Sequence, residues 1–106
     1  MANRSLSAKK QKVKQVAKSW FFYVLSCSDN SLYTGITTDV DRRVSEHNKK
    51  KGAKYTRSRL PVSLLYVRKM KDRSTASKLE ARFKKLKRAE KLSQLCKMVE
   101  EDNNIL

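Results

Sequence analysis

Cysteine is scarce in this chain of 106 residues, and its scarcity excludes structures that depend on several cysteines. Only two cysteines are present, Cys27 and Cys96. Two are too few for a disulfide framework, and their spacing fits no metal-binding motif. The low count excludes a small disulfide-stapled secreted domain and favours a reducing intracellular compartment.

Long apolar segments are also lacking. No apolar run approaches the length that is needed to span a membrane. The first residues contain no apolar core of the kind found in a signal peptide. We therefore expect no membrane association and a cytoplasmic location.

Acidic residues are few compared with basic ones. The chain has 10 Asp and Glu against 26 Lys and Arg, which gives a formal net charge of +16 at pH 7. Charge of one sign destabilises a compact body, and a polyanionic partner is the simplest explanation for it. A generally soluble basic protein is the alternative. We expect a nucleic acid, with RNA and ribosomal particles included in that class, and steeply salt-dependent binding.

The length fits one small domain with an extension at each end. Residues 1–18 carry six Lys or Arg and no acid, so we expect a flexible basic arm that adds affinity for phosphate. Residues 19–99 form the expected folded domain, and residues 100–106 are predicted to be a short acidic tail. Hydrophobic residues make up 39% and charged residues 34%, a globular composition.

The domain is predicted to be α+β. Aromatic and β-branched residues at 20–26, 32–36 and 62–67 indicate strands, and turn-forming residues at 28–31 make the first two a hairpin. A first helix opens at Thr38, a second runs from residue 72 or 74 to about 88, and a third follows. The order ββαβαα predicts a three-stranded, mostly antiparallel sheet flanked by helices.

The first helix is predicted to run from Thr38, with Asp41 completing a capping box, to Gly52. On this helix Arg43 and His47, the only histidine, stand side by side at the edge of the apolar stripe. They can be an ordinary snorkelling arginine and a structural histidine. They can also form part of a site, and the surrounding residues favour that interpretation.

Five residues follow one another in the order known from one family. In that family's first motif, Gly-Ile-Tyr, the matching stretch is Phe22-Tyr23-Val24, with Tyr23 as the tyrosine. The second motif, Tyr-Ile-Gly, matches Tyr33-Thr34-Gly35. An arginine and a histidine on the family's first helix match Arg43 and His47, and a glutamate on its second helix matches Glu80. Residues 20–90 thus resemble the GIY-YIG nuclease superfamily, above all its small single-domain bacterial YhbQ-like group.

The resemblance implies a metal-dependent endonuclease that hydrolyses phosphodiester bonds in DNA. Glu80 would hold one Mg²⁺ or Mn²⁺, with waters and phosphate oxygens completing its coordination. Arg43 would bind a non-bridging phosphate oxygen. Tyr23 or Tyr33 would orient the attacking water and act as the base. His47 would accept the tyrosine proton or hold the tyrosine hydroxyl in place.

Both tyrosines can serve one site only if they lie on the same face of the sheet. In a regular hairpin with the two-residue turn Asp29-Asn30, position 33 pairs with position 26, and the tyrosines face opposite sides. We therefore predict a loop with an odd number of residues, or a bulge in the ladder.

Basic residues crowd the segment after the first helix, where we expect a mobile loop that contacts phosphate. Tyr55 in this segment is suited to stack on an unpaired base. A second dense set, which includes Lys84, lies on the second helix. The expected nucleic-acid-binding residues are Lys49, Lys50, Lys51, Lys54, Tyr55, Arg57, Arg59 and Lys84.

Each feature also has a purely structural interpretation. Tyr23 and Tyr33 can be half-buried strand aromatics, and Glu80 can simply pair with Lys84 one helical turn away. The pattern as a whole favours a DNA endonuclease that recognises structure or charge rather than sequence. The main rival is a non-catalytic protein of the same fold that binds DNA, RNA or ribosomes. A protein partner that supplies specificity is a further possibility.

Overall fold

A computed structural model of the chain describes residues 18–104. Residues 1–17 of the predicted basic arm lie outside this range. The strands are β1 (Trp20–Ser26), β2 (Leu32–Thr37) and β3 (Ser63–Met70). Within the described range the helices are α2 (Val40–Asn48), α3 (Lys54–Arg57), α4 (Arg73–Lys84) and α5 (Arg88–Asn104).

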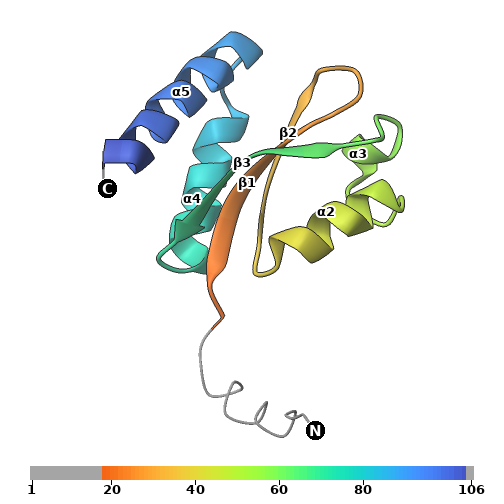
Figure 1. Cartoon of the computed structure of the whole chain (residues 1–106), viewed down its shortest axis with the longest axis horizontal. Helices are drawn as coiled ribbons and strands as arrows, with labels where there is room; N and C mark the ends of the chain where they lie inside the picture. The colour runs from red at the N-terminus through yellow and green to blue at the C-terminus, as the bar shows by residue number, and fades with distance from the viewer. Residues whose placement is uncertain (1–17, 105–106) are drawn as a thin grey trace, which may run out of the picture.

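The three strands form one antiparallel sheet in the order β2-β1-β3. Helices α4 and α5 lie on one side of the sheet, and α2 and α3 lie on the other (Figure 1). This arrangement confirms the predicted α+β fold with a three-stranded antiparallel sheet. The segment expected to be a mobile loop after the first helix instead contains the short helix α3.

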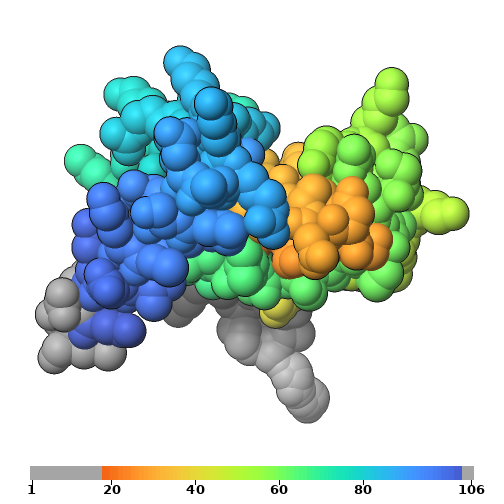
Figure 2. Space-filling view, turned by 90° about the horizontal axis from the view of Figure 1, so that it is seen from above, coloured from red at the N-terminus to blue at the C-terminus, as the bar shows by residue number. Residues whose placement is uncertain are grey.

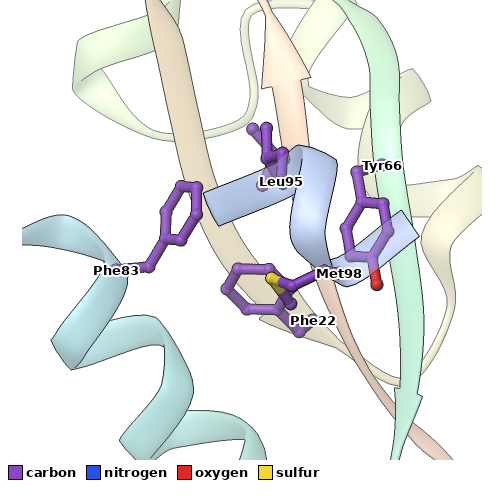
Figure 3. Packing of buried hydrophobic residues seen from close by; sticks show 6 residues of the cluster. Phe22, Tyr66, Phe83, Leu95 and Met98 are labelled. Atoms are coloured by element: carbon purple, nitrogen blue, oxygen red, sulfur yellow. The ribbon is translucent and has the colours of Figure 1, made fainter. Parts of the chain in front are cut away.

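Strand β1 is central and is buried on both faces, which explains its nearly continuous apolar sequence. Successive side chains of a strand point to opposite faces, so Phe22 and Val24 face α4 and α5. The Phe22 ring meets the Phe83 ring edge to face, with 5.4 Å between the ring centroids. Figure 3 shows this cluster, in which Leu95 and Met98 of α5 complete the packing.

The opposite face of β1 carries Tyr23 and Leu25. These two residues form a second buried cluster with Cys27 and Val62, against which Tyr33 and Val44 pack. The cluster lies between the sheet and α2, and it is the floor on which the candidate site is built.

Helix α2 begins one residue later than the sequence indicated. Asp39, not Thr38, is the N-cap, because its carboxylate accepts a hydrogen bond from the backbone N–H of Arg42 at 3.0 Å. Asp41 is an acidic residue of the first turn, but it does not complete a capping box with Thr38.

The end of α2 also differs from the prediction. The helix ends at Asn48 rather than at Gly52, and Lys50 adopts the left-handed conformation (φ 66°) after it. The backbone N–H of Lys50 bonds to the carbonyl of His47 at 3.0 Å, which closes the helix. Gly52 therefore has another role, which concerns His47.

Helix α4 begins after Asp72, whose carboxylate accepts a hydrogen bond from the Thr75 N–H at 2.8 Å. It ends at Lys84 rather than near Arg88, because a short break separates it from α5. None of the helices described for residues 18–104 is long and apolar enough to cross a membrane.

The C-terminal segment is not a separate tail as far as residue 104, because α5 continues to Asn104. Asp102 holds this last turn of α5 to the sheet. Its carboxylate accepts a hydrogen bond from the Tyr66 hydroxyl at 2.6 Å and pairs with Arg68 at 2.8 Å. Two of the acidic side chains that suggested a tail, Glu101 and Asp102, thus dock the helix end against β3.

Candidate active site

The loop between β1 and β2 decides where the two tyrosines lie. Ser26 pairs with Leu32, which leaves residues 27–31, an odd number, in the loop. Consequently Tyr23 pairs with Gly35, and Tyr33 pairs with the residue two positions after Tyr23. Both tyrosines therefore share one face, with 6.4 Å between their ring centroids, and the predicted odd loop is confirmed.

Gly35 makes room for the Tyr23 ring. A Cβ at position 35 would lie 2.6 Å from the Tyr23 hydroxyl oxygen, well inside contact distance. Gly35, the glycine of the second motif, therefore lets the side chain of Tyr23, the tyrosine of the first motif, lie over strand β2. Tyr23 is almost fully buried, with 1% of its surface exposed.

His47 is completely buried and is held by hydrogen bonds at both ring nitrogens. Its Nδ1 lies 2.8 Å from Thr56 Oγ1, and its Nε2 lies 3.2 Å from the Tyr23 hydroxyl oxygen. The Thr56 hydroxyl donates its hydrogen to the Ala53 carbonyl at 2.9 Å, so Thr56 Oγ1 can only accept from His47. Nδ1 therefore carries the proton, and Nε2 accepts a hydrogen bond from Tyr23.

Gly52 and helix α3 complete the seat of the His47 ring. A Cβ at position 52 would lie 2.2 Å from His47 Nδ1, so only glycine lets the backbone pass this close to the imidazole. Thr56, which α3 delivers to His47, was missed by sequence reasoning. Nothing in the sequence of residues 52–57 alone indicates a partner for a histidine.

Burial and nearby charges set the protonation states. Burial lowers the pKa of His47 below 6.5, and the nearby Arg43 lowers it further, so the imidazole is neutral near pH 7. Burial raises the pKa of Tyr23 to about 12, although the neighbouring Arg43 guanidinium opposes the shift. Tyr23 is thus a protonated phenol whose hydroxyl points at an unprotonated nitrogen.

Arg43 is fixed beside these two groups. Its Nη1 donates to a Glu46 carboxylate oxygen at 3.0 Å, and the side chain keeps 30% of its surface exposed. Its charge also acts on Tyr23, Tyr33 and His47. Arg43 therefore presents a partly exposed cation beside Tyr23 and His47, where an anion from solvent can reach it.

Glu80 reaches the site from α4, at the edge of the sheet formed by β2. Its charge raises the pKa of Tyr23, whereas that of Arg43 lowers it, so both act on the same hydroxyl. The carboxylate also pairs with Lys84 Nζ at 3.0 Å, and Lys84 Nζ lies 5.8 Å from the centre of the Tyr33 ring. The expected ion pair is present, and the structure places it within the site.

Residues 19–93 match the model of the GIY-YIG catalytic domain. The chain belongs to the GIY-YIG family. The match spans every element that contributes to the site described above. GIY-YIG is a nuclease fold that implies binding of nucleic acid, which agrees with the strong positive charge.

Relatives of the whole domain support the small YhbQ-like group within the family. The UPF0213 protein lin0209 of Listeria innocua is 53% identical over 85 residues, which cover 80% of this chain and 94% of that protein. The UPF0213 protein SAG0778 of Streptococcus agalactiae is 53% identical over 75 residues, 71% of this chain and 85% of that protein. The solution structure of EF2693 from E. faecalis is 48% identical, with a TM-score of 0.57 over 77% of this chain and 88% of that one.

The GIY-YIG site offers a divalent ion one carboxylate, that of Glu80. Within residues 18–104, no three His, Cys, Asp or Glu side chains cluster in a way that could hold a metal by themselves. One half-buried carboxylate fits an ion such as Mg²⁺, which retains most of its waters and takes further oxygens from a phosphate. It does not fit a metal that needs a full set of protein ligands.

The remaining predicted binding residues lie on one side of this site. Those at the end of α2 and on α3 are exposed cations: Lys49, Lys50, Lys51, Lys54 and Arg57. Arg59 differs, because it pairs with Asp29 at 3.1 Å and covers the Tyr55 ring at 3.9 Å. Tyr55 in turn stacks against Tyr33, with 6.0 Å between the ring centroids. The segment thus joins the tyrosine pair directly.

Proposed function

We propose that this chain is a divalent-metal-dependent endonuclease that hydrolyses phosphodiester bonds in DNA. The observation that supports this most strongly is the hydrogen-bonded relay from Tyr23 through His47 to Thr56 and Ala53. A buried tyrosine hydroxyl needs a hydrogen-bond partner, and an unprotonated imidazole nitrogen is a partner that can also take up the tyrosine proton.

Tyr23 is the better candidate for the base than Tyr33. In the proposed step, a water attacks phosphorus and passes its proton to the Tyr23 oxygen, while the Tyr23 proton moves to His47 Nε2. The P–O bond to the leaving strand end breaks, and the departing oxygen takes a proton from solvent water. Tyr33 has no comparable relay within the described residues, and its ring is covered by Tyr55 and approached by Lys84. We assign Tyr33 to shaping the site around the attacking water.

Arg43 and Glu80 handle the charge of the phosphate. Arg43 holds a non-bridging oxygen, and its half-exposed side chain allows a DNA backbone to approach. An Mg²⁺ or Mn²⁺ ion held by Glu80 would supply Lewis-acid stabilisation of the negative charge on the phosphate and on the leaving oxygen. Lys84, which pairs with Glu80 here, would then be free to contact a neighbouring phosphate.

Recognition in this proposal rests on structure or charge rather than on sequence. The residues beside the site are lysines, arginines and tyrosines, which contact phosphates and base faces but do not distinguish one base pair from another. A protein partner that adds specificity is compatible with the same surface.

The test is nicking of supercoiled plasmid and of labelled branched and linear DNA, with Mg²⁺, with Mn²⁺ or with EDTA. We expect metal-dependent cutting that Glu80→Gln abolishes and that Arg43→Ala reduces by about a hundredfold or more. Glu100→Gln removes the same charge from an exposed position on α5 and should leave the rate unchanged. Cutting that survives in both Arg43→Ala and Glu80→Ala would identify a contaminating nuclease.

A second function is favoured by one observation, the ion pair that occupies the Glu80 carboxylate at 3.0 Å. In a non-catalytic DNA-, RNA- or ribosome-binding protein, this pair would be the permanent state of Glu80. Tight binding to nucleic acid without cutting in either metal would establish this alternative.

A further inference from the structure

A depression next to the candidate active site has walls of unusual composition. It has a volume of about 360 Å³ and lies between β2, α3 and the α4–α5 junction. Its lining residues are Leu32, Tyr33, Thr34, Tyr55, Lys84 and Lys91. Figure 2 looks onto this side of the molecule, where the β1–β2 segment (orange) emerges between α3 (green) and the start of α5 (blue).

One wall is a fixed stack of planar groups. The rings of Tyr33 and Tyr55 are 29° from parallel, and the Arg59 guanidinium lies 3.9 Å from the centre of the Tyr55 ring. Arg59 is itself held by Asp29 at 3.1 Å and by the Tyr55 carbonyl at 2.8 Å. Tyr55 still has 40% of its surface exposed, so the stack is presented to solvent and is not part of the core.

The other wall is cationic. Lys84 Nζ stands 5.8 Å from the centre of the Tyr33 ring, and Lys91 lines the same depression from the first turns of α5. Arg88 fixes this wall to the hairpin, because its Nη2 donates to the Asn30 carbonyl at 3.0 Å. A ligand that satisfies both walls needs a flat aromatic part and an anionic part a few ångströms away, which describes a nucleotide.

Resting on the proposed function, we propose that this depression binds one unpaired base of the DNA strand that is cut. The base packs against the exposed surface of Tyr55 beside Tyr33, and its phosphate lies against Lys84 and Lys91. A base inside a duplex has both faces covered by its neighbours and cannot contact the tyrosine rings. The protein therefore favours DNA with a single-stranded segment, such as a flap, a gap or a fork, over continuous duplex.

The experiment measures binding by fluorescence anisotropy in EDTA, so that cutting plays no part. The probes are a labelled oligothymidylate and a duplex of equal length, and each is titrated with the intact protein, Tyr55→Leu and Tyr55→Phe. We expect Tyr55→Leu to weaken single-strand binding by roughly five- to a hundredfold, as expected for the loss of base stacking, and to leave duplex binding unchanged. Tyr55→Phe retains the ring and should bind both probes as the unaltered protein does.

A matched control separates stacking from charge. Arg57→Ala removes a neighbouring exposed cation of α3 and should weaken both probes to a similar extent. The single-strand probe with 2-aminopurine in place of one thymine gives a second readout, because stacking on an aromatic ring quenches its fluorescence. We expect quenching with the unaltered protein and with Tyr55→Phe, and none with Tyr55→Leu.

Two outcomes would overturn the inference, and they differ from a failure of the proposed function. Equal losses on both probes with Tyr55→Leu would mean that Tyr55 only supports the fold, and equal affinity of the unaltered protein for both probes would mean that no base is captured. In either case DNA binding and metal-dependent cutting could persist. If the unaltered protein bound neither the single-stranded nor the duplex probe, the proposed function would be refuted as well.

Discussion

His47 is the residue on which the candidate site depends most. Its ring lies against Gly52, its Nδ1 hydrogen is fixed by Thr56, and its Nε2 lone pair is directed at Tyr23. A charged imidazole would lose the hydrogen bond from Tyr23, because both ring nitrogens would then be donors. The site as built therefore requires the neutral form.

This requirement predicts how stability depends on pH. The pKa of His47 is lowered in the folded chain, so between that value and 6.5 the unfolded chain binds more protons than the folded one. Stability is therefore complete above pH 6.5 and decreases as the pH falls through this window. Chemical unfolding at several pH values from about 7 to 5 measures the effect.

The control is His47→Gln, which has no group that titrates in this range. The pKa values of Asp29, Asp72 and Asp102 are lowered from 3.8 by their hydrogen bonds, so these carboxylates titrate only in more acidic solution. His47→Gln should consequently show a flatter pH dependence between about pH 7 and 5. An identical slope in both proteins would refute the assignment of a neutral His47.

At the scale of the elements, the strands were more predictable than the ends of the helices. Strand β1 is buried on both faces. A short, continuous apolar run in a small domain is typical of such a central strand, so the sequence pattern was sufficient to predict it. The pairing of Tyr23 with Tyr33 on one face followed from the alternation of strand side chains. That prediction needed only the number of residues in the loop, because parity alone decides the face.

Other features of the elements depend on contacts that sequence patterns do not contain. A glycine after a helix usually ends it, but here Lys50 adopts the left-handed conformation and Gly52 instead accommodates His47. Helix α3 has only four residues, so no periodicity could reveal it. Thr56 and the double role of Lys84 depend on where α3 and α4 lie in space.

The start of α2 gives a test at this scale. Asp39 is the N-cap of the helix that carries Arg43 and His47, so Asp39→Ala should lower the free energy of unfolding by about 0.5–2 kcal/mol. Thr38→Ala should have a smaller effect. Urea denaturation of both variants measures the difference.

Asp39→Ser serves as the control, since serine caps a helix without a negative charge. It should recover most of the lost stability. A greater loss in Thr38→Ala than in Asp39→Ala would mean that the cap lies at the position that the sequence pattern first indicated.

For the molecule as a whole, the distribution of charge matters more than its total. Most acids of the described chain that form ion pairs hold arginines in place: Asp29, Asp39, Glu46, Glu101 and Asp102 pair with Arg59, Arg42, Arg43 and Arg68. Among residues 18–104, the cations at the end of α2 and on α3 form no such pair. Part of the unneutralised charge therefore borders the tyrosine pair.

The last prediction concerns the salt dependence of DNA binding. Replacing Lys49, Lys50 and Lys51 by alanine should flatten the plot of log affinity against log salt by about 0.9 for each duplex phosphate contact that is lost. The matched control replaces Lys69, Lys71 and Lys78, three exposed lysines near the β3–α4 turn, far from α3 in Figure 1.

Both triple variants lose the same net charge, so a general attraction between the protein and DNA would change equally in the two. Only the release of counterions from contacted phosphates distinguishes them, because it depends on where each cation lies. We expect the slope to change clearly for the α2 variant and little for the control. Equal changes would mean that DNA is held by diffuse charge over the whole surface. The face beside Tyr23 and Tyr33 would then not be the specific DNA-binding surface.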